Sequence, residues 1–432
     1  MFGKVLLTLS IALAAGAAQA SELPFSANDL AMLLPLNEAG EPLFKVRAGD
    51  PNLKILSEQN FNEVIAEAGR RHVFLNDKVR DPKNWYLVGV RYNPCEIFAG
   101  DVKPCKEQIR FVFQSHNNVR ESGGFDDYAI HVVYVYNEGK SPELSPRLES
   151  FRALKNAFGK QTAGRTLQVH PVLKSAAGAQ YFKMLSEEVI AKHVSNRHAT
   201  LLTFMGIGMG DSNSGERDDD DWRFMKGDVD ASGSWKATSL PTGHKESMQR
   251  MSLSEEEMDL ITNLKPISGQ PFLFGNGSRS VDKEVSLIIE ARKTNDHNVD
   301  CASCHIADRM GYPPGREYEP AEKAKLVRMT MGLLKSRARV SEVLVNDELQ
   351  TGRQGYEVPL PRIFGYLDAK AAIALRMSVD NSTATEAANK LLKLEEKPQC
   401  ASDAQRKAVI ECVFFGYGQD GNADKCIKKI CR

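Results

Sequence analysis

The sequence lacks an excess of charge of either sign. Its 432 residues include 56 Lys and Arg and 56 Asp and Glu, so the formal net charge is zero. A chain without net charge has no strong long-range attraction to nucleic acid or to an anionic membrane surface. We therefore expect neither of them as a partner.

Long apolar runs and familiar catalytic motifs are also missing. Beyond the first 20 residues, no stretch approaches the about 18 consecutive apolar residues that a membrane-spanning helix needs. No G-x-S-x-G, H-E-x-x-H, Walker or dinucleotide-binding run stands in the context that it requires, and there is no internal repeat. The chemistries that depend on those motifs have no signature in this chain.

The N-terminus has the features of an export signal. Lys4 supplies a positive charge, residues 5–15 are apolar, and Ala18-Gln19-Ala20 is a small-x-small cleavage site. The next residue is Ser21 rather than cysteine, which argues against a lipid anchor. We expect residues 1–20 to be removed and the mature protein to be periplasmic or secreted, without an integral membrane segment.

The most informative segment that is present is one C-x-x-C-H run, Cys301-Ala302-Ser303-Cys304-His305. Two thiols at this spacing on a helical turn can reach both vinyl groups of one porphyrin, and the histidine that follows can ligate its iron. The motif predicts one covalent haem c, attached through Cys301 and Cys304 and ligated by His305. Export agrees with this prediction, because haem is attached to such motifs outside the cytoplasm.

Two other chemistries use closely spaced cysteines. A thiol–disulfide redox pair stands at a helix start after a strand, whereas a helix and a polar loop are expected before this motif. A zinc site needs a second ligand pair at similar spacing, and none is near. Haem is therefore the favoured prediction.

The six cysteines outside the motif are even in number, as expected for an exported protein that forms disulfides. Cys95 and Cys105 are close in sequence and far from the others, so we predict that they pair. The remaining four lie in the last 33 residues, and all three of their possible pairings stay open: Cys400, Cys412, Cys426 and Cys431.

Alternating apolar residues predict an antiparallel sheet in the first half of the chain. Tyr86, Val88, Val90 and Tyr92 are expected to share one face of a strand. The other predicted strands lie at residues 109–113, 129–136, 201–207 and 222–225, and helical spacing predicts helices at 144–158 and 182–190. We expect an α+β domain over residues 21–245, with helices packed on the sheet.

Helical patterns dominate the second half, where no convincing strand is seen. Helices are predicted at residues 254–264, 281–293, 321–335 and 383–394, the last opened by a capping box of Thr383 and Glu386. We expect an all-α domain over residues 246–395, followed by a disulfide-linked helical tail over 396–432.

Residues from about 280 to 395 resemble the haem domain of class I c-type cytochromes, through the C-x-x-C-H motif and a late methionine. That family is a small helical fold with the motif early and the methionine before a last helix. The resemblance implies an all-α cytochrome c-like domain that carries out one-electron transfer between redox protein partners. The N-terminal half resembles no family with a function that can be transferred.

The same resemblance implies a methionine as the second axial ligand. Met377 follows His305 by 72 residues and is expected in a proline- and glycine-flanked loop just before the last helix. His297 precedes the motif and is a weaker candidate. Other methionines are poorer candidates, because they lie mid-helix or too close to His305: Met329, Met331 and Met310.

An iron with no side chain at its sixth position would support a different function. Peroxide or another small ligand could then bind, and the protein would be a peroxidase-like oxidoreductase or a haem-containing binding or sensor module. The single C-x-x-C-H motif argues against the di-haem peroxidases, which need two.

A calcium site is a minor alternative at residues 228–233. Asp228-Val229-Asp230-Ala231-Ser232-Gly233 resembles the start of a calcium loop, but Ser239 stands where a bidentate glutamate is usual. A polar turn after a strand explains the same residues. The acidic run at residues 218–221 is expected in a solvated loop.

Overall fold

The computed structural model describes most of the N-terminal half and several separate segments of the C-terminal half. The described residues are 22–96, 106–116, 124–136, 145–209, 217–240, 248–252, 301, 304–305, 320–334, 337, 339–345, 364–394, 398–415 and 422–431.

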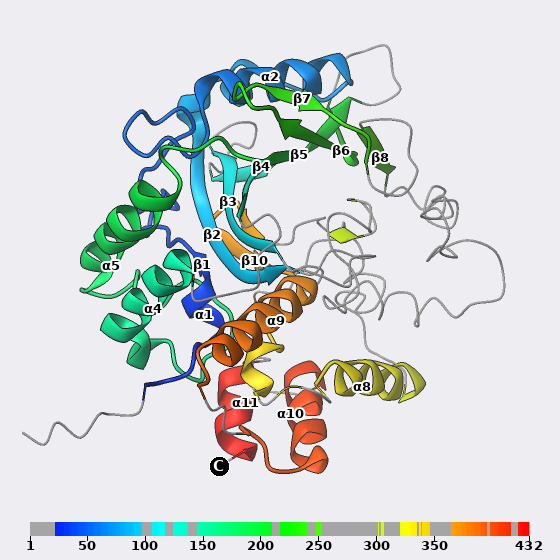
Figure 1. Ribbon diagram of the computed structural model, residues 1–432. Coiled ribbons are helices and arrows are strands. Elements are labelled where there is room, and N and C mark those ends of the chain that lie inside the picture. Colours follow the sequence, from blue (N-terminus) through cyan, green and yellow to red (C-terminus); the bar gives the residue numbers. More distant parts are fainter. Residues whose placement is uncertain are drawn as a thin grey trace, which may run out of the picture.

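A curved, eight-stranded antiparallel sheet dominates the fold (Figure 1). Strands β1 to β7 are neighbours in chain order, and β8 also pairs with β6. Their bounds are β1 (Ala31–Leu33), β2 (Trp85–Glu96), β3 (Lys106–His116), β4 (Phe125–Tyr136), β5 (Leu201–Met209), β6 (Arg217–Val229), β7 (Trp235–Ala237) and β8 (Met248–Ser252). The predicted antiparallel sheet is therefore confirmed, and it extends past residue 245 through β8.

Three helical segments cover the outer face of the sheet: α2 (Glu58–Arg70), α4 (Pro146–Phe158), and α5 (Gly178–Met184), which runs on into a π-helix (Leu185–Ala191) (Figure 1). The caps follow from the sequence, since Ser57 and Ser145 each accept a hydrogen bond from the backbone three residues on. These helices and the outward side chains of β2 to β5 bury one large cluster, here called the outer core. The shorter helical segments are α1 (Ala27–Leu30), α3 (Asp77–Arg80) and two 3-10 turns (Pro82–Asn84 and Gly159–Gln161).

The C-terminal half is mainly helical and carries two nested disulfides. Its helices are α8 (Pro320–Leu334), α9 (Leu375–Leu391), α10 (Asp403–Phe415), α11 (Ala423–Ile430) and a 3-10 turn (Val340–Glu342). Cys400 bonds Cys431 and Cys412 bonds Cys426, which selects one of the three open pairings. Cys95 is also disulfide-bonded, and its predicted partner Cys105 lies outside the described residues.

The expectation of an all-α C-terminal domain is wrong at one point. A two-stranded antiparallel hairpin of β9 (Phe364–Leu367) and β10 (Lys370–Ile373) lies directly before α9. The strands have four residues each and both are largely buried, so they show no alternation of apolar and polar residues. The helices predicted at residues 254–264 and 281–293 lie outside the described segments.

The start of α9 also differs from the prediction. The helix begins at Leu375 rather than at Thr383, so the two residues expected to cap it, Thr383 and Glu386, lie in its interior. The Thr383 hydroxyl donates to the carbonyl of Val379 one turn earlier, and Glu386 forms an ion pair with Arg337. The hydroxyl thus bonds within the helix and the carboxylate pairs with a residue outside it, so neither forms an N-cap.

Two further clusters bury the inner face of the sheet. The first, here called the helical core, joins β4, β5 and β6 to α8, α9, α10 and α11. The second, here called the hairpin core, joins β1, β2 and β3 to β9, β10 and the first turn of α9. Both cores combine residues from either side of the predicted boundary between residues 245 and 246.

A β-bulge in β2 divides four residues that were expected to share one face. The register with β3 shifts between Leu87 and Gly89. Tyr86 and Val88 consequently lie in the hairpin core, whereas Val90 and Tyr92 lie in the outer core. The extra residue reverses the alternation, so the prediction of a single face is wrong.

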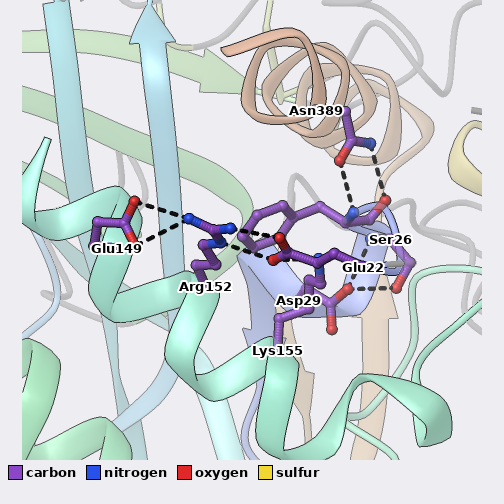
Figure 2. Close-up of polar contacts among 8 residues, drawn as sticks. Glu22, Ser26, Asp29, Glu149, Arg152, Lys155 and Asn389 are labelled. Atoms are coloured by element: carbon purple, nitrogen blue, oxygen red, sulfur yellow. Dashed lines mark hydrogen bonds and ion pairs between the residues drawn. The ribbon is translucent and has the colours of Figure 1, made fainter. Parts of the chain in front are cut away.

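The first described residues are held between α4 and α9 (Figure 2). Glu22 accepts two hydrogen bonds from Arg152 of α4, at 2.8 and 2.6 Å, and forms an ion pair with Lys155 at 3.3 Å. The backbone of Phe25 donates to the Asn389 side chain at 2.6 Å and accepts from it at 3.2 Å. The N-terminal segment therefore links a helix of the first half to one of the second.

Candidate functional site

The residues of the C-x-x-C-H motif lie in helical backbone against the inner face of the sheet. Cys301, Cys304 and His305 are half-buried, and both cysteines pack on the helical core. Neither cysteine forms a disulfide. Positions three apart on a helix are surface neighbours, so both thiols can reach the same flat ligand.

The imidazole of His305 packs against an aromatic ring from the sheet. The ring centroids of Phe224 and His305 are 5.0 Å apart, with an angle of 55° between their planes. Phe224 lies in β6 and is 1% exposed. The strand was expected from the sequence, but nothing in the sequence connects this side chain with a motif so far along the chain.

A buried indole N–H lies in the same core. Trp222 stands two residues before Phe224 on β6, on the same face, and is 1% exposed. Its Nε1 atom is buried and has no hydrogen-bond partner among the described residues. A buried donor without an acceptor costs free energy, so this position suits a ligand that brings an acceptor.

The residues present fit a haem. Two thiols three positions apart can form thioethers, and the adjacent imidazole can ligate iron. Phe224 lies against the imidazole, and Trp222 and Met205 are buried in the same helical core on which the motif cysteines pack. The carboxylates that a haem carries at its edge are acceptors of the kind that the Trp222 N–H lacks.

Met377 lies in the other inner core. It occupies the first turn of α9, is 4% exposed and packs in the hairpin core. The prediction of an irregular loop around Met377 is wrong, since β10 leads almost directly into the helix. In the described part of the chain, Met377 and the motif cysteines thus belong to separate cores.

The other candidates for an axial ligand are divided in the same way. Met329 and Met331 lie in α8, as expected, and pack on the helical core, as the motif cysteines also do. His297 and Met310 lie outside the described residues.

The segment that resembles a calcium loop is a tight turn between β6 and β7. The Asp230 carboxylate accepts hydrogen bonds from the backbone and hydroxyl of Ser232, at 2.9 and 2.5 Å, and forms an ion pair with Lys236 at 3.0 Å. These hydrogen bonds lower the pKa of Asp230 below its ordinary value. No cluster of three or more metal-binding side chains occurs among the described residues.

The acidic run at residues 218–221 lies within β6 rather than in a loop. Asp221 is fully buried and forms an ion pair with Arg223 at 2.5 Å. The expectation of a solvated loop is wrong because strand pairing with β5 and β8 includes these residues.

Comparisons with known proteins give no relative for this chain. No protein-family model matches it, and searches of curated proteins and of solved structures find no significant match. Within the residues that the structure describes, no helix is long and apolar enough to cross a membrane.

Proposed function

We propose that the protein is an exported mono-haem c-type cytochrome that transfers single electrons between redox partners. The observation that supports this most is the helical C-x-x-C-H motif, whose half-buried thiols and imidazole lie against an aromatic wall of the sheet. In this proposal Cys301 and Cys304 would hold the haem through thioether links, and His305 would bind its iron. The helical surroundings of the motif would form a haem domain similar to class I cytochromes.

The chain's own residues have three tasks in this mechanism. When a haem is bound, the two thioethers would fix it in one place, and a ring nitrogen of His305 would bind its iron. Phe224, against the imidazole, and its core neighbours Trp222 and Met205 would keep water from that side of the site. A bound haem supplies the one-electron chemistry, and a protein tunes its potential through the axial ligand and the surrounding dielectric.

Export is proposed on two grounds. The N-terminal segment has the composition of a cleaved signal peptide. The tail carries two disulfides, which persist in oxidising compartments such as the periplasm.

Met377 stays a prediction as the second axial ligand. Its place in the hairpin core gives specific support to a second candidate function, a haem-dependent oxidoreductase with an open sixth position. A haem-containing sensor that binds a small ligand would need the same open sixth position on the iron.

The optical spectrum of the purified ferric protein separates these functions. Electron transfer predicts low-spin iron that does not bind added cyanide at low concentration. High-spin iron that binds cyanide or peroxide readily would contradict electron transfer and support the oxidoreductase. Met377→Ala should convert low-spin to high-spin iron if Met377 is the ligand, and Met32→Ala, a fully buried methionine of the outer core, is the control.

A further inference from the structure

Phe224 lies in strand β6 of the main sheet. At this residue β6 is paired on both sides, with Met205 of β5 and with Gln249 of β8. The ring is 1% exposed and lies in the helical core beside Trp222. A buried ring on a strand that is hydrogen-bonded on both edges has little freedom to move.

The imidazole of His305, which packs against Phe224, would by contrast be free to rotate if it were held only by its bond to iron. An imidazole bound to iron through one nitrogen can still rotate about that bond, so its plane is set by contacts to the rest of the ring. Phe224 makes such a contact, with 5.0 Å between ring centroids and a tilt of 55°. That distance lies within the range for aromatic pairs with a preferred geometry.

We propose that Phe224 is a positioning residue for the axial imidazole, and that the N-terminal sheet thereby sets the electronic state of the haem. This inference rests on the proposed haem at Cys301, Cys304 and His305. It gives the sheet a task at the redox centre: β6 orients the ligand and keeps water away from it. The sheet is then a part of the haem site instead of an independent domain.

The test compares Phe224→Leu with Phe204→Leu. Phe204 lies on the adjacent strand β5, is 2% exposed and pairs in register with Met225, the residue after Phe224. Its side chain is in the outer core, on the opposite face of the sheet. Both substitutions remove a buried ring from neighbouring positions, but only one of them removes the contact with His305. Phe224→Tyr keeps the ring and tests for rescue.

Two readouts report on the ligand rather than on stability. The paramagnetic NMR shifts of the haem methyl groups depend on the orientation of the axial imidazole plane. The reduction potential falls when water reaches the site, because water stabilises the more highly charged ferric form. We expect Phe224→Leu to move the methyl shifts and lower the potential, while Phe204→Leu leaves both unchanged and Phe224→Tyr stays near wild type.

The outcomes separate this inference from the proposed function. Wild-type protein without covalent haem would overturn both. Wild-type protein with haem, whose methyl shifts and potential are the same in Phe224→Leu or change equally in Phe204→Leu, would overturn the role of Phe224 alone.

Discussion

At the scale of single residues, the ion pair of Glu22 and Arg152 makes stability depend on pH. The hydrogen bonds from Arg152 lower the pKa of Glu22 from 4.5 to about 2, against the opposing effect of burial. A carboxylate whose pKa is lower in the folded state stabilises that state at pH values above its unfolded pKa. This contribution is complete above pH 4.5 and is lost as the pH falls from there toward 2.

Glu22→Gln should therefore lower the free energy of unfolding by about 2 kcal/mol at pH 7, since it removes a charged hydrogen-bonded pair. The difference from wild type should shrink as the pH approaches 3, when measured by urea unfolding at several pH values. Glu149→Gln is the control, because Glu149 binds the same Arg152 but its side chain is 45% exposed. We expect its effect to stay below about 0.5 kcal/mol. An equal loss for both variants, or a pH-independent loss for Glu22→Gln, would contradict the assignment.

The residues of the candidate site differ in how far the sequence predicts them. Cys301, Cys304 and His305 could be found because haem attachment fixes their local spacing. Phe224 and Trp222 could not, since their contacts with the motif's surroundings depend on how β6 packs against distant segments.

At the scale of elements, the Gln114 side chain of β3 binds the backbone of β9, in addition to the backbone bridge between Phe125 and Asp368 and the hydrogen bond from the Tyr366 hydroxyl to Leu34. The Gln114 amide donates to the carbonyl of Tyr366 at 2.9 Å and accepts from its N–H at 2.7 Å, as a neighbouring strand would. The adjacent residue is Gly365, where a Cβ atom would lie 2.3 Å from the Gln114 side-chain oxygen. This close approach requires glycine.

Gln114→Leu should destabilise the protein by about 3 kcal/mol, because it leaves two buried peptide groups without partners. Gln108→Leu is a matched control on the same strand and face, and both glutamines are 2% exposed. The Nε2 atom of Gln108 has no hydrogen-bond partner among the described residues, so we expect a change below about 1 kcal/mol. Urea unfolding at neutral pH measures both, and similar values for the two variants would show that Gln114 does not anchor the hairpin.

Elements were predictable where a long pattern faces one core. The strands β3 to β5 and the helices α4 and α8 show such patterns and were found. The pattern fails at the bulge in β2, which adds a residue, and in β9 and β10, which are short and buried on both faces. The tail pairing could not be chosen, because sequence spacing does not tell which thiols the packing of α10 on α11 brings together.

At the scale of the whole molecule, the two halves share their cores. Ala384 and Ala388 of α9 belong to the outer core, and Asp380 forms an ion pair with buried Arg91 of β2 at 2.5 Å. Strand β8 adds pairing to β6 beyond residue 245. The first half therefore depends on the second for both apolar burial and charge compensation.

A fragment of residues 21–245 should not fold on its own. It loses α9 from the outer core and Asp380 from Arg91, and removing one partner of a buried ion pair costs about 3–5 kcal/mol. We expect weak near-ultraviolet circular dichroism and no cooperative urea transition, in contrast to the full chain. A fragment with native-like dichroism and a sharp transition would establish residues 21–245 as an independent domain.

The central claim is that one haem is bound covalently at Cys301 and Cys304, and the mass of the intact mature protein tests it most directly. Produced with a cytochrome c maturation system, the wild type should lose residues 1–20, gain the mass of one haem and keep it through denaturing electrophoresis. The double variant Cys301→Ala/Cys304→Ala should have no covalent haem, while Cys412→Ser/Cys426→Ser, which removes a tail disulfide, should keep it. A wild-type protein with the mass of the bare polypeptide would contradict the account.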